Sequence, residues 1–414
     1  MTETLLERAS QLVEHKRYLD AEKHLKEILS AEPNHTHALI LLSLCKSESG
    51  LNKEAIAIIK QALSQEPDND NILYLYSLYL FKDDQFSEAE KFAKNAIAFN
   101  PQNSSYFGLL GSIHLNQKNW QDALDQANKG LELDPEDLTC LNIRSTSLMK
   151  LGKKEEAYST IQEALYNDPE NDFTHANTGW GLLERGDHKK ALEHFREALK
   201  LNPENDYAKA GLVQGLKARY FFYRIFLKYV FWVGNMKGKL QWVVILGFYF
   251  GIKLLQSVSE NNEALAPLIN PIIFLYTLFA ISTWIIGPLS NLFLRLNVYG
   301  RYALTEEEIK SSNFVGVSLL VGLLGFLSHL VIPDFTVLMI GFFGVTMMIP
   351  LSSMFHPIKK SSQQVLIAYT IGLGLVGILA IVQQLFTGES ETLSYIYIFG
   401  VVAYQFVANA FVIR

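Results

Sequence analysis

The chain has 414 residues, which leaves room for more than one domain, because single hydrophobic cores stop growing near roughly 250–300 residues. Residues 1–216 carry 23 Lys/Arg against 34 Asp/Glu, whereas residues 217–414 carry 13 against 8, so an acidic part is followed by a basic one. An acidic soluble part argues against nucleic acid as the main partner, since phosphate binding needs a concentrated basic face.

The two cysteines and the first residues limit the class of protein further. Cys45 and Cys140 lie far apart and form no CxxC pair, so we expect neither a disulfide framework nor a zinc site, and a reducing compartment fits. The opening residues, MTETLLERAS, lack the basic and then apolar pattern of a secretory signal peptide.

Residues 1–218 follow a fixed interval of 34 residues. Prolines and alanines both recur at this interval, each alanine standing twelve residues before its proline: Pro33, Pro67, Pro101, Pro135, Pro169 and Pro203, with Ala21, Ala55, Ala89, Ala123, Ala157 and Ala191. A period of this length is typical of a solenoid of stacked units. Apolar residues between the prolines follow helical spacing, so each unit is predicted to be a pair of antiparallel helices.

The recurring residue types have physical reasons to recur in such a unit. Proline disfavours helical geometry in the residue before it and so ends the second helix, while alanine lets two helices cross closely. The turn inside each pair carries glycine in three units and an aromatic residue just inside the second helix in the other three: Gly50, Gly152 and Gly186, then Tyr18, Phe86 and Trp120. Glycine would supply a left-handed turn, and the aromatic ring would fill the helix pair.

This spacing resembles the tetratricopeptide repeat, with six full units over about residues 2–205 and a capping helix over residues 206–218. The tryptophan common near the start of such repeats is replaced here by Leu5, Leu39, Leu73, Phe107, Leu141 and His175. The resemblance implies an all-α solenoid whose first helices line a concave groove. The outward offsets of those helices are then the candidate contacts with a partner: His37, Ile40, Leu44, Asn71, Tyr74, Leu78, Phe81, Asn142, Thr146, Phe173 and Trp180.

The candidate contacts are mostly apolar or aromatic, with few cations. Members of the family that bind chaperones hold a partner's terminal carboxylate with lysine, arginine and asparagine, a set that this chain lacks. The resemblance therefore implies a protein partner, and the apolar side chains favour an apolar helix or an extended peptide. The alternative is that these side chains pack between the repeats. A metal site at His35 and His37 is less favoured than a solvated turn, because no third ligand stands nearby in sequence.

Residues 219–239 are basic and aromatic and precede the apolar part of the chain. If one helix continues through them, Lys217, Arg224 and Lys228 fall within about 40° of one another, with Trp232 among the surrounding aromatic residues. Such a helix is expected to lie at the membrane interface, attracted by anionic headgroups. The alternative is a further membrane span, which would bury Arg224 and Lys228 at a cost of about 2.5–3.5 kcal/mol each.

Residues 240–414 predict a polytopic bundle of about six transmembrane helices. The apolar stretches are 240–256, 268–292, 313–332, 334–351, 364–386 and 393–412. Runs of roughly 17–25 apolar residues match the thickness of a bilayer core. The alternative, a large soluble core, is disfavoured because soluble helices show a polar face and these barely do.

The distribution of charge predicts the orientation of that bundle. Twelve Lys/Arg lie ahead of the first span, in two alternate loops and at the last residue, whereas the loops 257–267, 332–334 and 387–392 carry none. Loops on the cytoplasmic side are enriched in Lys and Arg, so the repeats and the C-terminus are expected on the cytoplasmic side of an inner membrane.

A few polar residues interrupt the predicted spans. Lys253, His329 and Gln384 are candidate functional groups, since polar groups at membrane depth are costly. The alternative is structural, because Lys253 and His329 lie near the outer ends of their spans and glutamine can bond between helices. Two pairs of small residues predict close helix packing: Ser318 with Gly322, and Ala368 with Gly372.

The sequence contains no recognised catalytic motif. HExxH, a Walker phosphate loop and a GxSxG elbow are all missing, and residues 316–319 depart from the GxSG serine motif of rhomboid proteases. We therefore expect no enzyme, cofactor or metal, and a membrane-anchored scaffold that binds protein partners. The alternatives are a transporter or membrane enzyme regulated by its repeats, and a purely structural oligomer. The arrangement resembles bacterial membrane proteins that carry such repeats.

Overall fold

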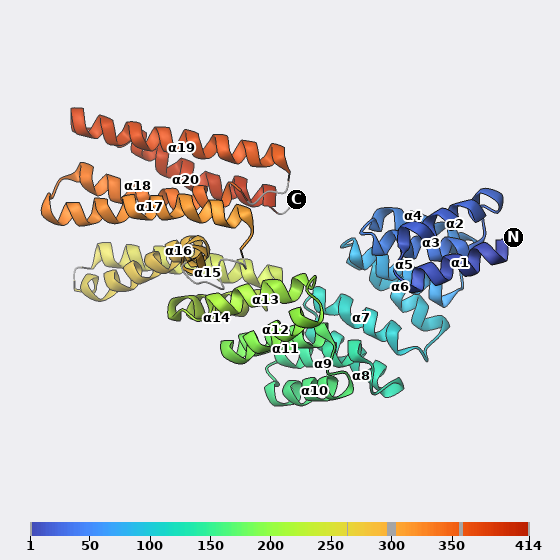
Figure 1. Ribbon diagram of the computed structural model, residues 1–414. Coiled ribbons are helices and arrows are strands. Elements are labelled where there is room, and N and C mark those ends of the chain that lie inside the picture. The colour runs from blue at the N-terminus through green and yellow to red at the C-terminus, as the bar shows by residue number, and fades with distance from the viewer. Residues whose placement is uncertain (1, 263, 296–303, 356–358, 413–414) are drawn as a thin grey trace. The chain divides into compact units, whose positions relative to one another are not determined.

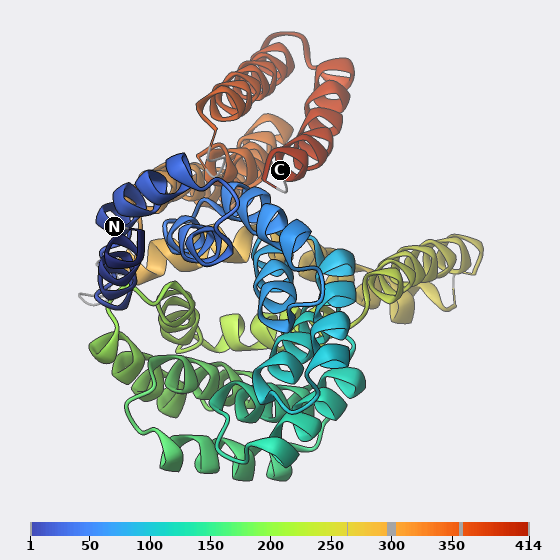
Figure 2. The ribbon, with the colours of Figure 1, turned by 90° about the vertical axis from the view of Figure 1, so that its right-hand side faces the viewer.

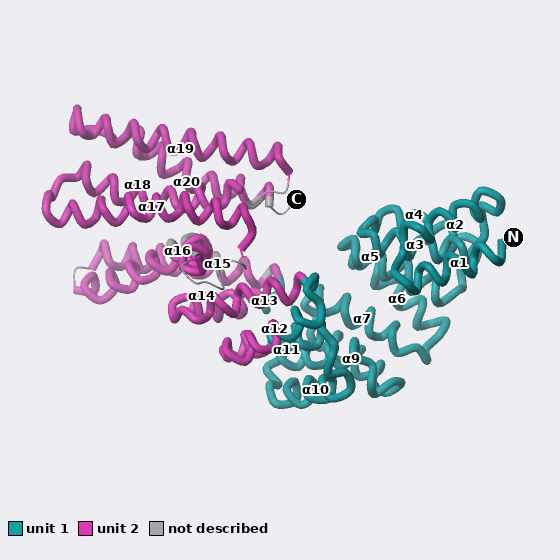
Figure 3. Tube along the Cα trace, viewed as in Figure 1, with its two compact units in different colours: residues 1–181, 197–205, 235–237 teal, residues 182–196, 206–234, 238–414 magenta. Residues whose placement is uncertain are grey.

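The structure is a computed structural model that describes residues 2–262, 264–295, 304–355 and 359–412. Within those ranges the secondary structure is entirely helical, so the predicted all-α class is confirmed (Figure 1). The chain forms two compact units (Figure 3). The first holds residues 1–181, 197–205 and 235–237, and the second holds residues 182–196, 206–234 and 238–414.

The repeats form helix pairs at the predicted interval. The first helices of the pairs are α1 Thr2–Glu14, α3 Thr36–Glu48, α5 Asp70–Lys82, α7 Ser104–Asn116, α9 Leu138–Lys150 and α11 Asp172–Arg185. The second helices are α2 Tyr18–Ala31, α4 Asn52–Gln65, α6 Phe86–Phe99, α8 Trp120–Leu133, α10 Lys154–Asn167 and α12 His188–Leu201, and α13 Asp206–Lys217 follows them. Figure 2 shows the pairs from α1 to α10 following one another along a curved path.

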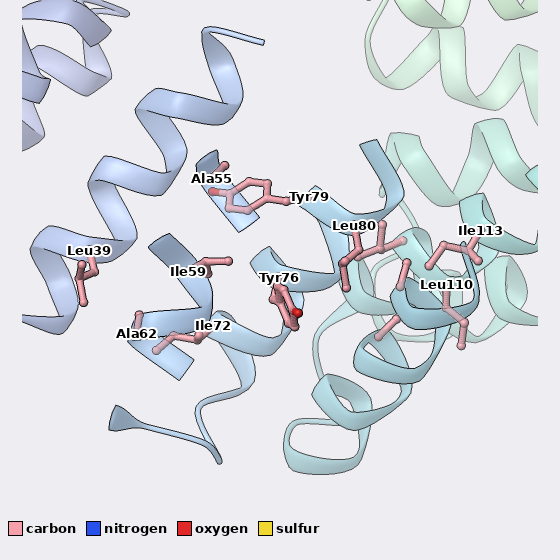
Figure 4. Close-up of a cluster of buried hydrophobic side chains, with 13 residues drawn as sticks. Leu39, Ala55, Ile59, Ala62, Ile72, Tyr76, Tyr79, Leu80, Leu110 and Ile113 are labelled. Carbon is pink, nitrogen blue, oxygen red and sulfur yellow. The ribbon is translucent and has the colours of Figure 1, made fainter. Parts of the chain in front are cut away.

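Small residues allow the helices of the array to cross closely. All six of the recurring alanines are wholly buried. Figure 4 shows one of the clusters around them, in which Ile59 of α4, Tyr79 of α5 and Ile113 of α7 have no exposed surface. The predicted role of alanine at the crossings is consistent with this packing.

The turn inside each pair places one residue in the left-handed region in all six units. Gly50, Gly152 and Gly186 have φ of 77°, 80° and 92°. In the other three units the same position is taken by Lys16, Asp84 and Lys118, with φ of 57°, 60° and 58°. All six units therefore share this backbone conformation. A residue with a Cβ atom adopts it at a steric cost that glycine avoids.

A polar side chain caps the first helix of several units at the same interval. His35, Asn69, Asn103 and Asp137 each stand at the N-cap and accept a hydrogen bond from a backbone N–H in the first turn. These bonds satisfy donors that have no partner inside the helix. The Nδ1 atom of His35 accepts from the amide of Ala38 at 3.3 Å, which gives this histidine a capping role.

The C-terminal helices of the second unit are long and apolar. They are α14 Phe221–Gly234, α15 Gly238–Asn261, α16 Ala266–Arg295, α17 Glu306–Val331, α18 Phe335–Ser353, α19 Lys360–Thr387 and α20 Glu391–Val412. Among the described residues, five helical segments are long and apolar enough to cross a membrane, in α15, α17, α18, α19 and α20. Helix α16 has 30 residues, with an apolar segment at Ala266–Ala280. These helices are consistent with the predicted bundle.

Helices α17 and α18 pack together through glycines. A Cβ atom on Gly344 would collide with the backbone of Gly322, and the hydroxyl of Ser318 donates to the carbonyl oxygen of Gly344 at 2.6 Å. The predicted close contact at Ser318 and Gly322 is therefore present. The second predicted pair is wrong, because a Cβ on Gly372 would meet nothing within 4 Å and Ala368 is exposed.

The end of the repeats shares a core with the apolar helices inside the second unit. Leu192 of α12 and Leu216 of α13 are buried together with Leu294 of α16 and Leu304, the residue before the N-cap of α17. Helix α13 approaches α12 so closely that a Cβ on Gly211 would collide with the ring of Phe195. Part of the sixth pair is thus packed as a component of this unit.

We expect Gly344→Ala to push α17 and α18 apart, because the new methyl group has no room beside Gly322. Overpacking of this kind costs about 1–3 kcal/mol, so the thermal midpoint of the full chain in detergent should fall by several degrees, measured by circular dichroism. Gly372→Ala is the matched control, since it adds the same methyl group in open space. Equal midpoints for the two variants would contradict the packing.

Candidate functional site

Ten of the eleven candidate contacts on the first helices fall into three rows that repeat every 34 residues, and Phe81 lies outside these rows. The outer row contains His37, Asn71 and Phe173, all of which are exposed. The middle row contains Ile40, Tyr74 and Asn142, and the inner row contains Leu44, Leu78, Thr146 and Trp180. The inner row is half-buried in every unit where it was predicted, so these side chains keep part of their surface accessible.

The middle row becomes more buried along the chain. Ile40 and Tyr74 are half-buried, whereas Asn142 is only 4% exposed. The Asn142 amide donates to the hydroxyl of Thr174 at 2.9 Å and accepts from the amide of Asn177 at 3.0 Å. The hydroxyl of Thr146 donates to the side-chain oxygen Oδ1 of Asn177 at 3.1 Å. These polar groups therefore join α9 to α11, which is the arrangement that packing between repeats requires.

Tyr74 is held in a second lateral link, between α5 and α7. Its ring stacks on Tyr106, with centroids 5.0 Å apart. The hydroxyl of Tyr106 and the amide of Asn100 both donate to the same carboxylate oxygen of Asp70, each at 2.8 Å. Those two hydrogen bonds, from Asn100 first and then Tyr106, hold the pKa of the Asp70 carboxyl below its ordinary value.

The inner row contains three apolar side chains, those of Leu44, Leu78 and Trp180, and one polar side chain, that of Thr146. Leu78 packs on the buried cluster of Figure 4, as does Phe81, whose ring lies 5.8 Å from that of Phe86. Phe86 thus fills its helix pair as predicted. Leu44 and Leu78 are one repeat apart, and Trp180 follows three repeats later, after the small polar residues Ser112 and Thr146 at the same position.

Trp120 and the residues beside it make hydrogen bonds that the sequence did not predict. Its indole N–H donates to the carbonyl oxygen of Asn235 at 3.3 Å, and Lys118 donates to that of Met236 at 3.0 Å. Lys237 donates in turn to the side chain of Asn119 at 2.9 Å. The turn between α7 and α8 therefore holds the segment 235–237 inside the first unit. These bonds could not be predicted from the sequence, because they join residues more than a hundred positions apart.

The basic residues predicted to share one helix face do not lie on one helix. Helix α13 ends at Lys217 and α14 begins at Phe221, so the angular spacing of an uninterrupted helix does not apply. Lys217 is only 6% exposed, with its ammonium 5.9 Å from the ring centre of Tyr223. Burial lowers its pKa, against the opposing attraction of Glu308. Arg224, Lys228 and Trp232 do share α14, where Lys228 and Trp232 are exposed.

Two polar residues of the predicted spans, His329 and Gln384, bond to residues of the turns that follow their helices. The ring of His329 bonds through Nδ1 to the carbonyl oxygen of Asp334 at 3.0 Å. The amide of Gln384 donates to the carbonyl oxygen of Gly388 at 3.0 Å and accepts from Ser390 at 2.7 Å. Lys253 is exposed on α15. Gln384 thus bonds to Gly388 and Ser390 in the turn after α19, whereas the structural alternative predicted a bond between helices.

The described residues offer no ready metal or nucleophile site. They contain no group of three or more His, Cys, Asp or Glu side chains placed to hold a metal ion. Both cysteines are buried, and burial raises the pKa of the Cys45 thiol to about 11. A thiol with that pKa is almost wholly protonated at neutral pH, which makes it a poor nucleophile.

Comparison with known families supports the repeat assignment. Residues 12–79 and 47–113 match a family described as tetratricopeptide repeat, and residues 173–205 match a second family of that description. The N-terminal part of this chain is a tetratricopeptide-repeat array. Residues 82–164 match the family described as anaphase-promoting complex, cyclosome, subunit 3. Tetratricopeptide-repeat arrays typically act as scaffolds for protein interaction.

Several solved structures resemble the tetratricopeptide-repeat array. PilF of Pseudomonas aeruginosa is 17% identical with a TM-score of 0.42, covering 50% of this chain and 95% of that chain. A thermophilic tetratricopeptide protein of Thermus thermophilus is 16% identical with a TM-score of 0.41, covering 44% and 98%. MamA of Desulfovibrio magneticus is 16% identical with a TM-score of 0.37, covering 41% and 95%. A search of curated protein sequences gives no significant match.

We expect Asp70→Asn to weaken the link between α5 and α7 of the tetratricopeptide-repeat array. The pKa of Asp70 is lower in the folded state, so its carboxylate stabilises the fold above the unfolded pKa, and this contribution is lost as the pH falls through the folded pKa. The variant should therefore have a lower thermal midpoint at pH 7 and a flatter decline from about pH 4 downward. Asp68→Asn, at an exposed turn, should keep the profile of the unsubstituted protein.

We expect Lys217→Met to stabilise the full chain at neutral pH by about 1 kcal/mol, because it removes a buried charge. The folded pKa of Lys217 lies below the unfolded value, so its charged side chain lowers the stability of the fold at neutral pH. This penalty disappears as the pH rises above the unfolded pKa, near 10.4. The advantage of the variant should accordingly shrink as the pH rises toward 10. Thermal unfolding at several pH values measures it, with exposed Lys189→Met as the control. A variant less stable at every pH would show that the ammonium is needed.

Proposed function

We propose that this protein is a membrane-anchored scaffold, in which the tetratricopeptide-repeat array binds a protein partner and the apolar helices fix the chain in a bilayer. The observation that carries the proposal is the joint presence of a repeat array and several helices of membrane-spanning length in one chain. We divide the chain into an array over residues 1–218, an interfacial segment over residues 219–239 and a transmembrane bundle over residues 240–414.

The membrane placement follows from exposure and charge. Large apolar side chains such as Leu330, Phe386 and Phe399 are 79%, 81% and 75% exposed, and a bilayer would cover surface of this kind. The excess of Lys and Arg on alternate loops orients the bundle. We therefore assign a multi-pass protein of the inner membrane, with the array and the C-terminus on the cytoplasmic side.

The partner is proposed to be an apolar helix or an extended peptide segment. The half-buried inner row presents Leu44, Leu78 and Trp180, and the outer row adds the exposed ring of Phe173. Burying such side chains contributes about 25 cal/mol for each Å² removed from water. His37, Asn71 and Thr146 would then bond to polar groups at the edge of the occupant.

A scaffold is favoured over a transporter or membrane enzyme by the bonds inside the bundle. His329 and Gln384, which a catalytic or transport site would need to have available, bond to carbonyl groups in the turns that follow their helices. Helices α17 and α18 meet glycine to glycine, which leaves no passage between those two helices.

Site-specific crosslinking tests the proposal. A photoreactive amino acid placed at Leu44 or Phe173 in the full chain, in native membranes, is expected to capture one defined partner, identified by mass spectrometry. The matched controls are Leu19 on α2 and Tyr166 on α10, which are 73% and 88% exposed but lie on second helices. They should capture that partner at least tenfold less.

Two outcomes would count against the scaffold. Equal capture from second-helix positions would contradict the assignment of the binding face to the first helices. No capture from any first-helix position would contradict the binding of a partner. Loss of a cellular phenotype on substituting Lys253, at unchanged protein level and unchanged capture, would instead favour a function of the bundle itself.

A further inference from the structure

Helix α14 borders a deep apolar hollow inside the second unit. The hollow has a volume of about 720 Å³ and is lined by side chains of α14 and α16, with Val345 of α18. Its two serine hydroxyls are already engaged, since Ser282 donates to the carbonyl oxygen of Phe279 and Ser290 to that of Gly287. The walls therefore offer aromatic and aliphatic surface with very little hydrogen-bonding capacity.

A second hollow adjoins the first at the same helix. It has a volume of about 320 Å³, and its polar side chains are Arg224, Lys228 and His188. Phe221 and Ile225 line both hollows, so the apolar space and the cationic space meet along α14.

The cations of the second hollow, Arg224 and Lys228, lack a counter-ion among the residues that the structure describes. Within the described ranges, neither Arg224 nor Lys228 forms an ion pair, and the guanidinium of Arg224 lies 6.0 Å from the ring centre of Phe221. The neighbouring acid, Asp187, is engaged in accepting the backbone N–H of Lys190 at 3.2 Å. Burial, with Arg224 nearby, lowers the pKa of His188, so its ring is neutral at pH 7 and able to hydrogen-bond without adding charge.

We propose that these two hollows form a binding site for one anionic phospholipid, with an acyl chain in the apolar hollow and the phosphate between Arg224 and Lys228. The inference rests on the proposed membrane placement and goes beyond it, because it assigns a specific site in place of general attraction to anionic lipid. Guanidinium and ammonium groups are the usual partners of phosphate in proteins.

The chemistry of the walls favours a lipid over a peptide in the apolar hollow. A peptide backbone would bring N–H and C=O groups that these walls cannot bond, at a cost of desolvation, whereas an acyl chain carries none. The volume falls within the range of roughly 300–1,000 Å³ that is usual for small-molecule sites. The adjoining cations select a negative headgroup over a zwitterionic one.

Native mass spectrometry of the full chain in detergent measures the site directly. The protein is offered phosphatidylglycerol or phosphatidylcholine with identical acyl chains, and retained lipid is counted. Arg224→Gln with Lys228→Gln should lower the preference for phosphatidylglycerol by roughly thirtyfold, which is what about 1 kcal/mol per cation gives. Lys189→Gln with Lys190→Gln removes the same charge from exposed positions of α12 outside the hollow and should leave the preference unchanged.

A second variant tests the apolar hollow separately. Ser282→Phe places a ring into it and should reduce retention of both lipids to a similar extent. Circular dichroism of each variant checks that the fold is intact. Equal retention of the two lipids by the unsubstituted protein, or an unchanged preference after loss of Arg224 and Lys228, would overturn the site. Displacement of the lipid by inorganic phosphate alone would mark a site for a soluble anion and would also overturn it.

Alkaline extraction of membranes separates this inference from the function on which it rests. Release of the chain as a soluble protein would contradict both the membrane placement and the lipid site. A chain that stays in the membrane but shows no lipid preference would overturn the lipid site alone.

Discussion

Close approach of helix axes at small side chains holds each of the two units together. In the array the recurring alanines are wholly buried, and a Cβ on Gly130 would collide with the sulfur of Cys140. In the bundle, Gly322 and Gly344 bring α17 and α18 into backbone contact. Larger side chains at these points would push the axes apart, so one steric constraint fixes the separation of the helices in both units.

A constant separation makes the array a regular support for variable side chains. Every pair has a left-handed backbone conformation at the same position of its turn, and a polar N-cap recurs in several units. The three rows of the first helices therefore recur at equal steps. The side chains in these rows differ in type and burial from unit to unit. The middle row changes from the half-buried Tyr74 to the buried Asn142, while the inner row stays accessible. In the proposed scaffold, selectivity for a partner would therefore depend chiefly on Leu44, Leu78 and Trp180.

The sequence predicted whatever depends on local periodicity. Helix pairs at 34-residue steps, the left-handed turn at Gly50 and the small-residue contact of Ser318 follow from spacing alone. Three features escaped because they depend on tertiary contact. The first is the burial of Lys217 at the end of α13. The second is the hydrogen bond from the indole of Trp120 to a carbonyl group distant in sequence. The third is that close packing occurs at Gly344 and not at Gly372. The exposure of the outer row could not be predicted either, because packing of these side chains between the repeats was an open alternative.

Residues 182–196 of the sixth repeat pack against the apolar helices inside the second unit. Leu192 of α12 is buried against Leu216 and Leu294, and the ring of Phe195 fills the space beside Gly211. Signalling between a partner site and a lipid site would require this core to have two arrangements of similar energy. Close packing at a glycine without room for a methyl group favours a single arrangement, because any shift would open a void or create a clash. The cluster therefore suits a fixed anchor better than a switch.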